Sequence, residues 1–257
     1  MLAQVALSMF AIGLLLGFVG AGGSGFIISI LTVGFGYSIH TVLGTALLAM
    51  LLSSLSGAVS HYRQGNMRLG IGVVAGAGGA AGAWWSSGLA VDIPSRTLGM
   101  LTASMLILSG AALWLRLRFG ARRDAEAAEE PAADAKRGTL RSRLGALGIG
   151  LATGTMSGLF GIGSTPFIQL GLLAVLGLSA RLAAGTTMAI IVPIALGGGL
   201  GYYRTGHLDL GLLAAVAPSI MLGSYLGAKL TGRVPVRFLQ GAIVAVPIAG
   251  GLILLIG

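Results

Sequence analysis

Two short glycine-rich segments hold the residues of this sequence that could bind a ligand. The first is Gly20-Ala21-Gly22-Gly23-Ser24-Gly25-Phe26-Ile27, and the second is Gly161-Ile162-Gly163-Ser164-Thr165-Pro166-Phe167-Ile168. Glycine in a helix interior costs about 1 kcal/mol relative to alanine, and proline about 3 kcal/mol, so each segment is expected to interrupt a helix. Close packing of membrane helices is the alternative explanation, because Gly-x-x-x-Gly spacing is common where such helices touch.

An interrupted helix offers its backbone to a ligand. The helix that restarts after each break, near Ser24 and near Thr165, would present unpaired N–H groups and a partial positive charge. Glycine lets an anion approach the backbone closely, and the serine and threonine hydroxyls add donors. The predicted substrate-binding residues lie on the two segments and on the helix that follows each: Gly22, Gly23, Ser24, Gly25, Thr45, Gly163, Ser164, Thr165, Pro166 and Thr186. Thr45 and Thr186 also have a structural explanation, since a membrane threonine often bonds the carbonyl four residues before it.

A second group of polar residues lies near the predicted helix ends. His61, Arg63, Arg181 and Arg204 could line a gate or vestibule for an anion. Arginine at a helix end also complements the helix dipole or extends to the membrane interface, and a loop histidine is often only solvated. Both explanations are kept for these four residues.

The composition indicates a membrane protein. Apolar residues make up 55% of the chain and charged residues 9%, and no Asp, Glu, Lys or Arg precedes Arg63. Uncharged runs of roughly 20 residues recur, which is the length of a membrane-spanning helix, and they do not alternate as barrel strands do. We predict an all-α polytopic protein with helices over 3–36 (broken at 20–25), 41–61, 69–90, 96–115, 144–178 (broken at 161–166), 182–202, 209–229 and 237–256.

The second half of the chain repeats the first at an offset of 141 residues. Tyr62-Arg63-x-Gly65 falls on Tyr203-Arg204-x-Gly206, and Pro94 falls on Pro235. Such self-similarity is the signature of duplication. The sequence therefore predicts a first membrane repeat over 1–115, a charged linker over 116–143 and a second membrane repeat over 144–257.

Loop charges predict how the two repeats are oriented. Eight of the sixteen Lys and Arg lie in the linker, so the positive-inside rule places it in the cytoplasm. A parallel second repeat would put Lys229, Arg233 and Arg237 outside, whereas an inverted one leaves only Arg204 there. We therefore predict two inverted repeats of about five helical elements each, with a glycine-broken hairpin first in each repeat and both termini outside.

The charges favour an anionic substrate over a metal cation. Outside the linker the acids are Asp92 and Asp209, both near predicted loops, so no carboxylate within a membrane helix could bind a cation. Backbone carbonyls could still bind Na⁺. The chain has no cysteine and three histidines, and we expect no metal site, no cofactor and no enzymatic activity. Its basic residues do not interleave with aromatics, so nucleic acid is not an expected partner.

The duplicated Gly-x-Gly-(Gly/Ser)-(Ser/Thr)-(Gly/Pro)-Phe-Ile pattern, the Gly-Thr pair in the next helix and the Tyr-Arg-x-Gly motif resemble the TauE/SafE family. The resemblance covers the chain outside 116–143. It implies a multi-pass protein of the bacterial inner membrane, in which the outside termini predicted from the loop charges are periplasmic. It also implies a secondary transporter that exports sulfite, organosulfonates or other small sulfur-containing anions. The two inverted breaks would bring that substrate near the midplane of the lipid bilayer.

One position departs from the family pattern. Family members usually carry a proline after the glycines, and Pro166 keeps it, but Gly25 replaces it in the first half. The two predicted tips are therefore expected to be unequal. An anion channel or a permease for another small anion is the alternative function, and the glycine-rich helices could also support a homodimer.

Overall fold

The computed structural model describes residues 1–19, 24–119, 140–162, 164–231 and 236–257. Every regular element in these ranges is helical. In chain order they are α1 (Leu2–Val19), α2 (Ser24–Ser29), the π-helical η1 (Ile30–Gly34), α3 (Ile39–Arg63), α4 (Leu69–Val91), α5 (Ser95–Phe119), α7 (Leu140–Phe160), α8 (Thr165–Ala174), α9 (Ala180–Arg204), α10 (Leu210–Thr231) and α11 (Val236–Ile256).

The predicted helices and the separation of each first segment into two helices are confirmed. Most helix ends fall within about three residues of the expected ones. The differences of four residues are at the end of α5, the start of α7 and the end of α8. Helix α5 extends to Phe119 and so continues into the segment predicted as linker. Leu115, Leu117 and Phe119 alternate with Arg116 and Arg118, so apolar residues continue along the helix beyond the first charge.

Four described helical segments are long and apolar enough to cross a membrane, judged by length and composition. They are Ile39–Arg63, Ser95–Arg118, Arg181–Arg204 and Leu210–Gly227. Shorter apolar helices accompany them, including Ser24–Gly34 and Thr165–Ala174, each of which follows one of the two breaks. The chain is therefore a helical, polytopic membrane protein.

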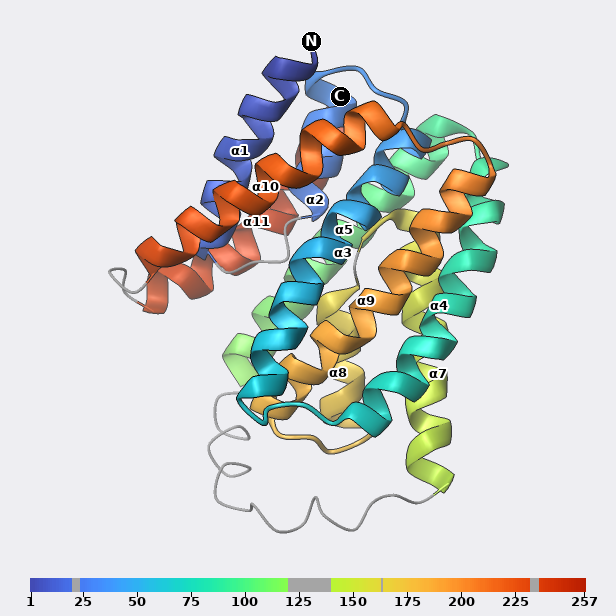
Figure 1. The fold of residues 1–257 in the computed structure, drawn as a ribbon, viewed down its shortest axis with the longest axis vertical. Helices are drawn as coiled ribbons and strands as arrows, with labels where there is room; N and C mark the ends of the chain where they lie inside the picture. Colours follow the sequence, from blue (N-terminus) through green and yellow to red (C-terminus); the bar gives the residue numbers. More distant parts are fainter. Residues whose placement is uncertain (20–23, 120–139, 163, 232–235) are drawn as a thin grey trace.

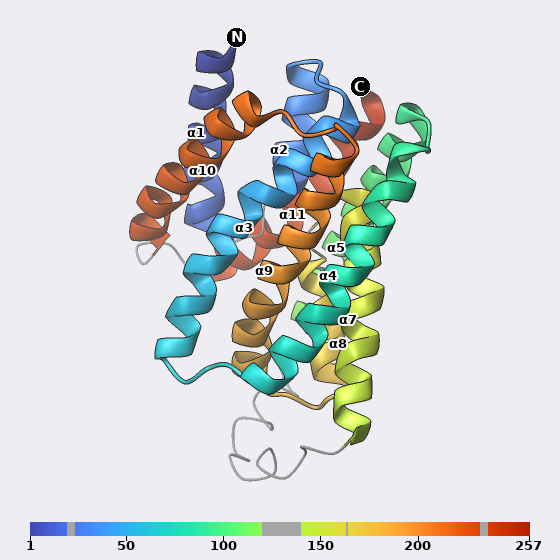
Figure 2. The same ribbon diagram turned by 45° about the vertical axis from the view of Figure 1, so that its right-hand side comes forward.

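Helices α3 and α9 pack against each other at the centre of the molecule and run in opposite directions (Figure 1). The most extensive contacts join α4 to α7 and to α9, α1 to α10, α3 to α9, and α5 to α11. Figure 2 shows the α1–α10 pair on the opposite side of α3 from α4 and α7. Both termini lie at one end of the molecule, and α5 ends and α7 begins at the other (Figure 1).

Close glycine contacts hold the helices together in matched pairs. A β-carbon on Gly13 of α1 would lie 2.7 Å from the carbonyl oxygen of Ile220 in α10. A β-carbon on Gly154 of α7 would lie 2.5 Å from the Cα of Gly79 in α4. Adding 141 to 13 gives 154, and adding 141 to 79 gives 220, so the two contacts join equivalent positions. The same offset relates Gly44–Tyr202 to Gly185–His61, Gly82–Leu151 to Gly223–Phe10, and Gly110–Val244 to Gly251–Ala103.

Candidate functional site

The second break lies between α7 and α8. Helix α7 ends at Phe160, and Gly161 follows with φ 62°, a left-handed conformation that glycine adopts at little cost. A β-carbon on Gly161 would lie 2.9 Å from the Cβ of Leu43, so the break packs directly against α3. Pro166 occupies the first turn of α8, where its missing N–H costs nothing. The helix is therefore interrupted here both by the left-handed backbone at Gly161 and by the proline that begins α8.

A pair of buried serine hydroxyls lies at this break. Ser157 Oγ donates to Ser164 Oγ at 3.0 Å, and Ser164 Oγ donates to the carbonyl oxygen of Ile162 at 3.2 Å. The two side chains are 0% and 1% exposed, respectively. Ser164 has φ 43°, the one positive φ among the described non-glycine residues. Its side chain does not cap α8, so it leaves the helix's first N–H groups without that partner.

Tyr202 contributes a third buried hydroxyl, which bonds the residue that follows Ser157. Its O–H group donates to the carbonyl oxygen of Gly158 at 2.9 Å, and its side chain is fully buried. Gly158 lies in the last turn of α7, where carbonyls have no partner within the helix. Tyr202 thus connects α9 to the end of α7 that leads into the break.

Sequence reasoning missed Ser157 and Tyr202. At the repeat offset Ser157 falls on Leu16 and Tyr202 falls on His61. The shared Tyr203-Arg204 motif drew attention to the exposed neighbour rather than to the buried tyrosine. A usable signal was present, because position 202 and its equivalent both carry a polar ring one residue before that motif.

The Tyr202 hydrogen bond has a measurable consequence. We expect Tyr202→Phe to lower the free energy of unfolding by about 1–3 kcal/mol, because the buried carbonyl of Gly158 loses its donor. Thermal unfolding of the purified protein in detergent measures the change. Tyr203→Phe is the matched control, since Tyr203 is 57% exposed on the same helix. Equal melting temperatures for both variants would contradict a structural role for the Tyr202 hydroxyl.

The first break lies between α1 and α2. Ser24 and Gly25, the first residues of α2, are buried. Ser29 Oγ hydrogen-bonds to the carbonyl oxygens of Gly25 at 2.8 Å and Gly250 at 2.5 Å, and so joins α2 to α11. The predicted binding residues Gly22, Gly23 and Gly163 lie outside the described residues.

One hydrophobic cluster connects the surroundings of the two breaks. It contains Ile27 and Ile28 of α2, Ile162 of the second break, Leu43 of α3 and Tyr202 of α9. From the interior of the molecule, α2 extends toward the end that carries the termini and α8 toward the opposite end (Figures 1 and 2). Each short helix therefore begins inside the protein, where its N–H groups are shielded from lipid.

The two predicted threonines have hydrogen-bond partners within the protein. Thr45 Oγ1 donates to the carbonyl oxygen of Thr41 at 2.8 Å, which is the structural alternative. Thr186 Oγ1 accepts the backbone N–H of Arg68 at 3.1 Å and so joins α9 to the start of α4. Both side chains are fully buried. Their participation in a substrate site stays a prediction.

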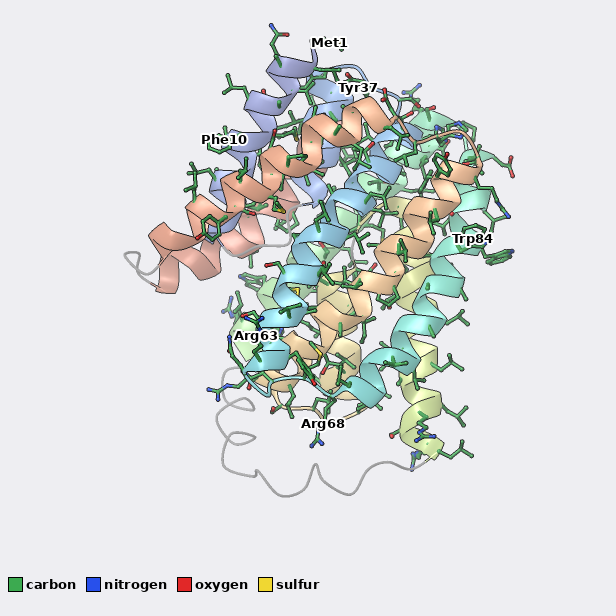
Figure 3. All side chains as sticks on the ribbon, viewed as in Figure 1. Met1, Phe10, Tyr37, Arg63, Arg68 and Trp84 are labelled. Atoms are coloured by element: carbon green, nitrogen blue, oxygen red, sulfur yellow. The ribbon has the colours of Figure 1, made fainter. Side chains whose placement is uncertain are left out.

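Three of the predicted vestibule residues lie where α3 ends and α9 begins, and the fourth, Arg204, lies at the other end of α9. His61 and Arg63 are in the last turn of α3, and a β-carbon on Gly185, one turn after Arg181, would lie 3.0 Å from the Cβ of His61. Arg63, Arg181 and Arg204 are exposed. Arg63 lies at the end of the molecule opposite Met1 (Figure 3), and the Arg204 guanidinium lies 4.9 Å from the centre of the Trp84 ring. His61 Nδ1 is buried without a hydrogen-bond partner. Among the described residues, no hydrogen bond or ion pair joins these four residues to one another or to the serine pair.

The two other histidines, His40 and His207, lie close together where α3 begins. The rings of His40 and His207 have centroids 5.4 Å apart, and His40 Nε2 is 3.1 Å from the carbonyl oxygen of Ile93. These contacts gather the start of α3, the α4–α5 turn and the α9–α10 turn at one end of the molecule. Within the described residues, no group of three or more His, Asp or Glu could hold a metal ion.

Comparison with known proteins identifies the family. The sequence profile "Sulfite exporter TauE/SafE" matches residues 5–254. The chain is 44% identical over 251 residues to "Probable membrane transporter protein YdhB" of Bacillus subtilis (strain 168), and the match covers 98% of this chain and 99% of that protein. No solved structure matches the chain. Because the profile spans nearly the whole chain and the relative aligns end to end, the chain belongs to the TauE/SafE family of membrane transporters.

Proposed function

We propose that the protein is a secondary transporter that exports small sulfur-containing anions, such as sulfite or organosulfonates, across the bacterial inner membrane. The observation that carries this proposal is the buried Ser157–Ser164 pair at the N-terminus of α8. Hydroxyl donors and a helix N-terminus together suit an oxyanion, since both present positive charge to it. The family name of the matching profile supports sulfite as a member of the substrate class.

The placement of the acids supports an anion rather than a cation. Asp92 follows the last residue of α4, and Asp209 Oδ1 accepts the backbone N–H of Leu212 at 2.9 Å to cap α10. Neither carboxylate is inside a membrane-spanning helix. A cation at the breaks would therefore depend on backbone carbonyls alone.

We further propose two inverted repeats, over 1–115 and 144–257, with both termini in the periplasm. They are joined by a cytoplasmic segment over 116–143, whose two ends are the last turn of α5 and the first turn of α7. Support comes from the matched glycine contacts, in which α1–α10 and α7–α4 use equivalent positions. The packing of equivalent helices differs between the two halves, because α4 packs extensively on α9 whereas α10 packs much less on α3. Exchange of these two packing arrangements would open the site to alternate sides, which is how many inverted-repeat transporters work.

An anion channel with the same binding residues is the second candidate. The buried serine pair would serve it equally well, because selectivity in a pore also depends on donors that line it. Proteoliposomes separate the two functions. Accumulation of the anion against its own gradient, driven by an imposed ion gradient, requires a transporter, whereas a channel only dissipates gradients.

The first test of the proposal is anion binding to the purified protein. We expect sulfite or an organosulfonate to raise the melting temperature, and a ligand at 100 times its dissociation constant adds about 2.7 kcal/mol of stability. Sulfate, thiosulfate, chloride and divalent metals are compared in the same series. Ser164→Ala is expected to weaken the binding of the stabilising anion about ten-fold or more, because a hydrogen bond to a charged group contributes about 1.5–3 kcal/mol.

Ser104→Ala is the matched control for that variant. Ser104 is exposed on α5, and its Oγ donates to the carbonyl oxygen of Met100 in its own helix. The Ser104→Ala variant should bind the anion as the wild-type protein does. Stabilisation by divalent metals alone, or full anion binding by Ser164→Ala, would contradict the proposed site.

A further inference from the structure

Arg116 is a half-buried cation that contacts a neutral partner. It lies in the last turn of α5, and its Nη1 group donates to Gln169 Oε1 on α8. Both side chains are half-buried, whereas Arg63, Arg118 and Arg204 are exposed. A guanidinium taken partly out of water normally gains an acidic partner or a set of acceptors, because desolvating a charge is costly.

The carboxylates of the described side chains lie at the other end of the molecule. Asp92 precedes α5, and about 20 helical residues, or about 30 Å, separate it from Arg116. Asp209 lies two residues from His207, whose ring is 5.4 Å from that of His40, at the same end as Asp92. The amide of Gln169 is therefore the acceptor that the described structure gives to the Arg116 guanidinium.

Gln169 also places this pair next to the second break. It lies four residues after Thr165 on α8, so the two side chains share one face of the helix at a separation of about 6 Å. Helix α8 runs from the break toward the end of the molecule where α5 ends and α7 begins (Figure 1). Arg116 and Gln169 therefore lie between Ser164 and the linker end of the protein.

The equivalent positions beside the first break carry no such pair. At the repeat offset, Gln169 falls on Ile28 and Arg116 falls on Gly257, neither of which can bind an anion through its side chain. The route from the other end of the molecule to the breaks therefore lacks a matching cation at these positions. The polar pair makes the two faces of the protein chemically different.

We propose that Arg116 and Gln169 form an anion-binding station between α5 and α8, which receives the substrate from the linker side before it reaches Ser164. The proposal rests on the transport function above. Arginine has five N–H donors in a planar fork, and the oxygen of a sulfur oxyanion can replace Gln169 Oε1 as the acceptor. The Gln169 amide then turns, so that its NH₂ group donates to the same anion.

A structural role is the alternative, since a cation in the last turn of a helix complements its dipole. Arg118 provides the matched comparison. It lies in the same last turn, is exposed, and its guanidinium lies 5.1 Å from the centre of the Trp114 ring. Both arginines complement the dipole of α5, but Arg116 is the one that contacts α8.

The test uses the full-length protein in proteoliposomes of known orientation, with sulfite or sulfoacetate supplied to either face. We expect Arg116→Gln to raise KM about ten-fold or more for substrate supplied at the linker side, with a change of less than about two-fold from the other side. Maximal rate should change little. Arg118→Gln should leave both KM values near wild type, and Arg116→Lys should recover part of the loss, because it restores the charge but not the fork.

Two readouts separate this inference from the function beneath it. The station is overturned if the wild-type protein transports a sulfur anion and Arg116→Gln leaves KM unchanged. It is also overturned if Arg118→Gln raises the linker-side KM as much as Arg116→Gln does. Wild-type protein that is thermally stabilised by the anion in an Arg116-dependent manner but carries no flux overturns the transport function and retains the station. If the wild-type protein shows no flux and no stabilisation by the anion, both the station and the transport function are overturned.

Discussion

Gly154→Leu is expected to abolish the packing of α7 against α4 and to remove most folded protein from the membrane. Even a β-carbon at this position would lie 2.5 Å from the Cα of Gly79, so a leucine side chain would collide with backbone that cannot rotate away. Overpacking a core by extra carbons costs about 1–3 kcal/mol when side chains can adjust, and more is expected here because two helices must separate. Size-exclusion chromatography of detergent extracts measures the fraction of monodisperse protein.

Gly148→Leu is the control on the same helix. No atom lies within 4 Å of a β-carbon at Gly148, so leucine there projects into open space and should leave the folded fraction near wild type. The equivalent first-half change, Gly13→Leu, should resemble Gly154→Leu, because Gly13 meets the backbone of Ile220. Comparable yields for the Gly154 and Gly148 variants would show that α4 and α7 do not pack as closely as described.

The helices were predictable because their boundaries depend on local chemistry. Uncharged runs must form helices to satisfy their backbone groups in lipid, and polar turns such as Gln64-Gly65-Asn66 end them. The second break was predictable for the same reason, since Gly161, Gly163 and Pro166 all oppose a continuous helix. These inferences needed no knowledge of which helix lies beside which.

The contacts were not predictable, because they depend on partners distant in the sequence. A serine in an apolar helix reads the same whether it bonds its own backbone, as Ser104 does, or another side chain, as Ser157 does. The interaction of Arg116 with Gln169 was hidden because residue 116 was assigned to the linker, whereas it is within α5. Charge marks the end of an apolar run, but a helix continues while its apolar residues still have neighbours.

Gly161→Ala is expected to impair transport more than any other single added methyl group in the breaks that the structure describes. The residue has φ 62°, and a left-handed conformation costs an ordinary L-residue about 1–2 kcal/mol. The new β-carbon would also lie 2.9 Å from the Cβ of Leu43 and 3.0 Å from its Cα, so α3 or the break must shift. Because Ser164 is only three residues away, that shift moves the proposed anion site, and we expect flux to fall on the order of ten-fold or more.

Gly206→Ala separates backbone strain from displacement of the site. Gly206 has φ 75°, but no atom lies within 4 Å of its β-carbon position, so alanine there brings a similar conformational cost without a collision. Thermal unfolding should report losses of stability for both variants, whereas flux in proteoliposomes should fall strongly in Gly161→Ala alone. Equal flux in the two variants at equal folded fraction would mean that the break does not position the substrate, and that Gly161 serves only to turn the chain between α7 and α8.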